Sequence, residues 1–143
     1  MPYEYLEDVA VADIAFRAWG PELDDVFTAA AAATTKVMAD DLEAIRPLET
    51  REVELRQREP DLLLFDFLQE IVYFKDAERL LLLVDRVRVA AEGAGLLLTA
   101  TLKGERIDPD RHSLRADVKA VTLHGFSLVR TGPYWEATVV LDI

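Results

Sequence analysis

The sequence contains no cysteine, and this absence excludes several kinds of chemistry. A chain without cysteine has no thiol nucleophile, no disulfide framework and no cysteine-ligated zinc site. Basic residues are also scarce, because 16 Lys and Arg stand against 27 Asp and Glu, which gives a net charge of −11. A protein that binds nucleic acid by itself needs the opposite sign of charge to displace counterions from phosphates. We therefore expect no strong direct binding of RNA or DNA.

Long apolar runs and phosphate-binding loops are missing as well. No apolar stretch approaches the roughly 18 residues of a membrane-spanning helix, and the first residues lack the basic and apolar regions of a signal peptide. We expect a soluble, cytoplasmic protein that does not associate with membranes. The six glycines form neither GxGxxG nor a Walker-type motif, so a standard nucleotide-binding loop is not predicted.

The remaining composition is that of a folded domain. Hydrophobic residues make up 51% of the 143 residues, and a chain of this length typically forms one domain with a substantial core. No linker rich in Pro, Gly and Ser interrupts the sequence, and no repeat is recognisable. We therefore expect a single domain over residues 1–143.

Apolar periodicity predicts an α+β fold. The spacing of apolar residues predicts one helix from Pro21 to about Ala39 and a second from Pro60 to Phe74. Alternating or continuous apolar residues predict strands at residues 13–19, 52–57, 80–91, 96–102, 122–130 and 134–141. We expect the two helices to pack on one largely antiparallel, mixed sheet. The second helix is apolar around most of its circumference, so it should be central, between the sheet and other elements.

The supply of residues for nucleophilic catalysis is small. The chain has two serines and two histidines, and His124 and Ser127 lie an odd number of residues apart on a predicted strand. Their side chains would then point to opposite faces. His112 and Ser113 are neighbours in a polar, irregular stretch over residues 103–120, without the sequence of a nucleophile elbow. A Ser–His hydrolase is therefore not favoured.

Acidic residues are the abundant candidate ligands, and oxygen ligands favour hard cations such as Ca²⁺ or Mg²⁺. In the last predicted strand Asp142 lies on the face opposite Leu141, as Asp13 does beside Ile14 in the first strand. The terminal carboxylate of Ile143 follows directly. If the two strands meet, three carboxyl groups converge and repel each other unless a divalent cation neutralises them. The alternative is two unrelated surface aspartates and a frayed terminus.

Several segments, taken in order, resemble the archease family. They are YEYLE at residues 3–7, ADIAFRAWG at 12–20, the acidic and apolar segment 61–74, VKAVTLHG at 118–125, and LDI at 141–143. The resemblance implies an accessory protein for an RtcB-type RNA ligase, which joins RNA ends in tRNA splicing and RNA repair. Such proteins promote guanylylation of the ligase and its multiple turnover, and do not themselves join RNA.

The resemblance also implies a set of functional residues. A divalent cation, most often calcium, would be held by Asp13, Asp142 and Ile143. The alternation of side chains along the first and last strands points to the same residues. Lys119 matches a recurring lysine of the family, and we expect Lys119, His112 and His124 to belong to the surface that faces the partner. The chain departs from the family at Ala10, where a histidine is usual.

Two other functions stay open from the sequence. The chain could be a small metal-dependent hydrolase of phosphoesters, in which a cation-bound water attacks and Lys119 or His124 assists proton transfer. It could also be a chaperone-like interaction module that needs no metal.

Overall fold

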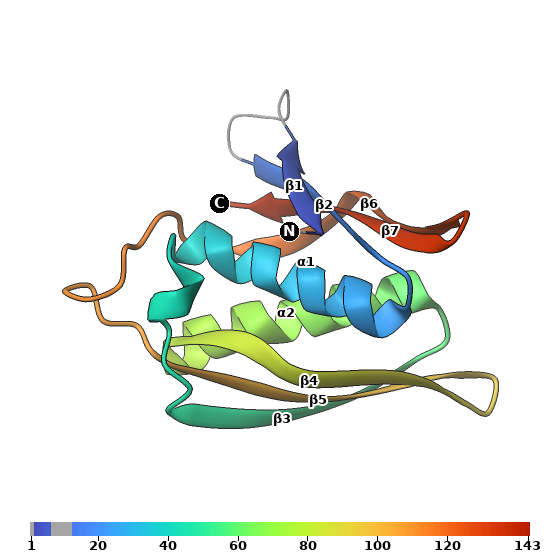
Figure 1. Cartoon of the computed structure of the whole chain (residues 1–143), viewed down its shortest axis with the longest axis horizontal. Coiled ribbons are helices and arrows are strands. Elements are labelled where there is room, and N and C mark those ends of the chain that lie inside the picture. The colour runs from blue at the N-terminus through green and yellow to red at the C-terminus, as the bar shows by residue number, and fades with distance from the viewer. Residues whose placement is uncertain (1, 7–12) are drawn as a thin grey trace.

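The strands form two antiparallel sheets with the helices between them (Figure 1). The computed structural model describes residues 2–6 and 13–143. One sheet has the order β1 (Tyr3–Leu6), β2 (Asp13–Gly20), β7 (Tyr134–Asp142) and β6 (Ala120–Thr131). The other has the order β3 (Glu49–Gln57), β5 (Gly95–Arg106) and β4 (Leu80–Glu92). The helices are α1 (Leu23–Met38) and α2 (Pro60–Glu78), and a short 3-10 helix, η1, spans Leu42–Ala44.

This architecture confirms an α+β fold with two helices and differs from the expected single, mixed sheet. Each described strand pairing is antiparallel, and the strands divide between two sheets. The reason is the apolar surface of the helices. Both helices contact strands of both sheets, and one sheet can cover only one side of a helix layer. The prediction that α2 lies in the centre is correct, because its apolar residues Leu63, Phe67 and Ile71 are buried.

The ends of several elements differ from the sequence prediction. Strand β5 continues to Arg106 and β6 begins at Ala120, which shortens the irregular stretch from residues 103–120 to 107–119. Helix α2 continues four residues beyond Phe74, to Glu78. Strand β1 was not predicted from periodicity. It is defined by its pairing with β2, in which Tyr3 lies opposite Ala18.

A wide bulge interrupts β6. Thr122 pairs with Val140 and Ser127 pairs with Thr138, so residues 123–126 stand opposite Val139 alone. Gly125 lies within the bulge with a φ of 77°, a conformation that glycine adopts without steric cost. The simple alternation of faces therefore does not hold between His124 and Ser127.

The described part of the chain has no helix that combines the length and apolar character needed to cross a membrane.

Candidate functional site

The first and last strands of the predicted site lie side by side. In the β2–β7 pair, Asp13 stands directly opposite Asp142, and Ile14 stands opposite Leu141. Leu141 is fully buried and packs in the core with Ile14, while both aspartates are partly exposed. Residues directly opposite each other in an antiparallel pair share a face. The two aspartates therefore lie on the sheet face that points away from the helices, as the alternation of side chains along each strand predicted.

The chemistry of this pair fits a hard cation. Directly opposite residues have Cβ atoms about 4.5–5.5 Å apart, so two carboxylates at these positions can share one ion. Ile143 follows Asp142 directly in the sequence. Within residues 2–6 and 13–143, no group of three or more His, Asp or Glu side chains is arranged as a metal site.

Lys119 lies beside this pair. Its backbone N–H donates a hydrogen bond of 2.8 Å to the carbonyl oxygen of Asp142, and the next residue, Ala120, pairs with Asp142 across β6 and β7. Lys119 is exposed. The segment therefore brings an exposed lysine next to the strand end that carries Asp142.

His124 lies on the bulge of β6 and is exposed. The hydroxyl of Thr122 donates to its carbonyl oxygen at 3.1 Å, which fixes the backbone at the start of the bulge. His124 is therefore accessible on the same edge strand as Ala120, and its contact with a partner stays a prediction.

His112 does not lie on the surface, which corrects the expectation that it faces a partner. Its side chain is 1% exposed. The backbone N–H of Asp108 donates to its Nδ1 at 2.8 Å, and its Nε2 lies 3.2 Å from Oε2 of Glu105. His112 is held inside the turn that follows β5, so its role is to fix the shape of that turn.

Glu105 is the acceptor at the centre of this network. Its carboxylate accepts hydrogen bonds from the backbone N–H of Arg46 at 2.6 Å, from the guanidinium of Arg111, and from His112. Burial raises the pKa of this carboxyl group, but the hydrogen bonds outweigh burial and lower the pKa to about 2. Glu105 is therefore a buried anion at neutral pH and joins η1, β5 and the turn.

Comparison with known proteins places this geometry in a family. The sequence pattern of the "Archease protein family (MTH1598/TM1083)" matches residues 3–143. The chain belongs to the archease family. It is 34% identical to the protein archease of Methanopyrus kandleri over the full length of both chains, and 33% identical to that of Sulfurisphaera tokodaii over 99% of this chain and 98% of the relative.

Two solved structures have the same fold. The solution structure of Methanobacterium thermoautotrophicum protein 1598 is 35% identical, covers 99% of both chains and superposes with a TM-score of 0.86. A crystal structure from Thermotoga maritima, described as that of an archease and possible chaperone, has a TM-score of 0.66 at 20% identity over 94% of this chain and 93% of that chain. The departure from the family at Ala10 lies outside the described residues.

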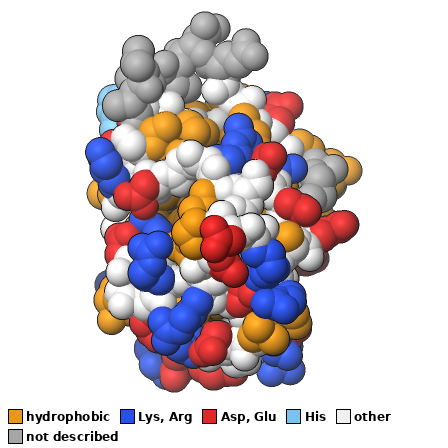
Figure 2. All heavy atoms as spheres, turned by 90° about the vertical axis from the view of Figure 1, so that its left-hand side faces the viewer, with side chains coloured by type: hydrophobic (Ala, Val, Ile, Leu, Met, Phe, Trp, Pro, Cys, Tyr) orange, Lys and Arg blue, Asp and Glu red, His pale blue; other side chains and the backbone are white. Residues whose placement is uncertain are grey.

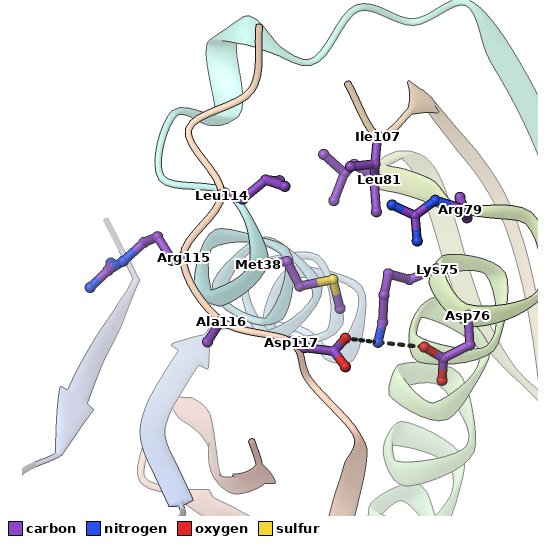
Figure 3. A pocket seen from close by; sticks show the side chains of 10 residues that line it. All are labelled: Met38, Lys75, Asp76, Arg79, Leu81, Ile107, Leu114, Arg115, Ala116 and Asp117. Carbon is purple, nitrogen blue, oxygen red and sulfur yellow. Dashed lines mark hydrogen bonds and ion pairs between the residues drawn. The ribbon is translucent and has the colours of Figure 1, made fainter. Parts of the chain in front are cut away.

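Sequence analysis missed a polar contact between α2 and the segment that carries Lys119. The side chain of Lys75 is 7% exposed, and its Nζ lies 2.5 Å from Oδ1 of both Asp76 and Asp117 and donates to the carbonyl of Val118 at 2.7 Å. Figure 3 shows this ammonium group between the two carboxylates, in the wall of a pocket of about 340 Å³. A signal was available, because Lys75 lies four residues after Ile71 on the buried stripe of the helix.

This end of the molecule carries charges of both signs. Figure 2 shows Lys, Arg, Asp and Glu side chains interspersed around apolar ones on this face. A second hollow, of about 400 Å³, lies beside Asp13 and is lined by Tyr5, Val37 and Arg115 among others. The candidate site therefore lies next to a partly apolar hollow.

Proposed function

We propose that this archease-family chain is a metal-binding accessory protein that activates an RtcB-type RNA ligase. In this role it promotes guanylylation and multiple turnover of the ligase in tRNA splicing and RNA repair, without being an enzyme itself. The observation that supports the proposal most is the register of β2 and β7, which sets Asp13 opposite Asp142. These are the positions at which the family resemblance implies a cation.

Asp13, Asp142 and the terminal carboxylate of Ile143 would hold the cation. All three supply oxygen ligands, so calcium is the first choice and magnesium the second. A bound calcium ion would supply positive charge that neutralises the mutual repulsion of the three groups. With the cation bound, the carboxylates would hold the end of β7 against β2. Lys119 would lie beside them.

The charge of the chain supports a basic partner. A net charge of −11 speeds the encounter with a positively charged cleft, such as one that normally binds RNA. Exposed Lys119 lies next to Asp142, and exposed His124 lies further along, in the bulge of β6; both would contact the ligase. This association needs no direct binding of nucleic acid by the chain.

The test is a ligation assay over many turnovers with the matching ligase. The wild-type chain should accelerate turnover, Asp142→Asn should lose the acceleration, and Asp110→Asn, which makes the same charge change at an exposed turn, should retain it. No acceleration by the wild-type chain would reject the proposal. Phosphoester turnover by the isolated chain that depends on Asp13 would favour the hydrolase, and partner binding unchanged by a chelator would favour the chaperone-like module.

A further inference from the structure

A buried ammonium group links α2 to the segment that leads into β6. Lys75 is the charged residue of α2 that points into the protein, and its three donor hydrogens have three acceptors: Asp76, Asp117 and the carbonyl of Val118. Burying an ammonium group is costly, and apolar side chains of similar volume often stabilise a fold at least as well. The contacts of Lys75 therefore contribute more to fixing the position of Asp117 and Val118 than to the stability of the fold.

A second side chain of α2 holds the same segment. Oε1 of Gln69 accepts a hydrogen bond of 2.9 Å from the backbone N–H of Val121. Strand β6 is at the edge of its sheet, so within residues 2–6 and 13–143 no strand pairs with the backbone groups on its outer side. Lys75 and Gln69, which we call the α2 clamp, supply partners for the backbone of Val118 and Val121 in place of a strand.

The clamped segment leads directly to the candidate site. Lys119 follows Val118, and its N–H donates to the carbonyl oxygen of Asp142 at 2.8 Å. Residues 118–121 are thus held by α2 on one side and by the end of β7 on the other. Any displacement of this segment would move Lys119 and release the backbone of Asp142.

We infer that the α2 clamp positions the site, in that Lys75 and Gln69 fix the segment that holds Lys119 beside Asp142 and Ile143. Lys75 and Gln69 are positioning residues and do not touch a cation themselves. The part of this inference that concerns cation affinity rests on the proposed function. Asp76 offers a matched control, because it pairs with Lys75 from the adjacent position of the same helix, is 56% exposed, and lies outside the clamped segment.

The experiment compares Lys75→Met, Gln69→Leu and Asp76→Asn with the wild-type chain. Amide hydrogen exchange of Lys119 and Val121 is measured by NMR, and cation affinity by calorimetry with calcium chloride alone. We expect both clamp variants to exchange these amides about 10-fold faster and to bind calcium about 10-fold more weakly, the size typical for residues that orient metal ligands. Asp76→Asn should stay within about twofold of the wild type in both measurements, well below that effect.

The outcomes separate this inference from the proposed function. A wild-type chain that binds no calcium would reject the proposed cation site, and the amide exchange alone would then decide on the clamp. Clamp variants that match Asp76→Asn in exchange and affinity would overturn the inference, even if their thermal stability is reduced. If Lys75→Met does not fold, as judged by circular dichroism, Gln69→Leu decides the question, since it acts on the same segment.

Discussion

Asp13 and Asp142 lie directly opposite each other in the β2–β7 pair, on the sheet face that points away from the helices. Like charges at directly opposite positions of an antiparallel pair destabilise it. The β2–β7 pair therefore carries an electrostatic cost at this position, and a cation bound there would remove it.

The first prediction concerns the stability of Asp142→Asn. In the presence of a chelator, this variant should unfold with a free energy about 0.2–1 kcal/mol higher than that of the wild type, because one repelling charge is gone. In calcium the order should reverse, because only the wild type gains the free energy of binding. Urea unfolding in both conditions measures the effect, with Asp110→Asn as the control. A wild type that gains no stability from calcium contradicts the prediction.

The second prediction concerns acid and Glu105. The pKa of its carboxyl group in the folded protein, about 2, lies below the ordinary value of 4.5. A carboxyl group with a lowered folded pKa contributes stability that is complete above its unfolded pKa and is lost as the pH falls toward the folded pKa. Glu105→Gln should cost about 1.5–3 kcal/mol at neutral pH, because charged hydrogen bonds to buried groups are lost.

The difference in free energy of unfolding between the wild type and Glu105→Gln should shrink as the pH falls from 4.5 toward about 2. Urea unfolding across this range measures it. The control is Glu54→Gln, since Glu54 lies exposed on β3 in an ion pair with Arg56. A difference that stays constant with pH would show that Glu105 is not the group that titrates.

The sequence predicts well which face of a helix or strand is buried. It predicts less well which element packs on that face. The two helices and the four strands from residue 80 onward follow from periodicity, because a side chain's direction is fixed within its own element. The division into two sheets does not follow, because periodicity does not show which element lies against a buried face. Strand β1 has four residues and is defined by its pairing with β2.

The candidate site shows the same contrast between what one element determines and what depends on its neighbours. The placement of Asp13 and Asp142 on one face was predictable, because the period of a strand is two and their apolar neighbours point to the core. The burial of His112 was not predicted, because it depends on Glu105, which lies in another element. Lys75 was not singled out, although it lies on the buried stripe of α2, because its partner Asp117 lies in another element.

The third prediction is the tautomer of His112. Its Nδ1 accepts a hydrogen bond from the backbone N–H of Asp108, so that nitrogen carries no proton, and Nε2 must carry the proton that it donates to Glu105. We therefore expect the proton on Nε2 and none on Nδ1. Nitrogen chemical shifts of the imidazole ring distinguish the two tautomers, with exposed His124 as the internal reference. A proton on Nδ1 would contradict the hydrogen bond from Asp108.

The fourth prediction concerns Gly104, which lies on β5 opposite Leu82 of β4. A Cβ atom at Gly104 would overlap the carbonyl oxygen of Leu81. The backbone there cannot move aside easily, because Gly104 pairs with Leu82 on one side and with Glu49 on the other. Gly104→Ala should therefore lower the free energy of unfolding by about 3 kcal/mol, the upper end for overpacking, because the clash involves main-chain atoms on a central strand.

Gly93→Asn is the control for Gly104→Ala. Gly93 has a positive φ of 58° in the β4–β5 turn, no atom lies within 4 Å of its added Cβ, and asparagine tolerates this conformation. Thermal unfolding followed by circular dichroism should show a large loss for Gly104→Ala and a small one for Gly93→Asn. Equal midpoints for Gly104→Ala and the wild type would mean that β4 and β5 can separate at this point.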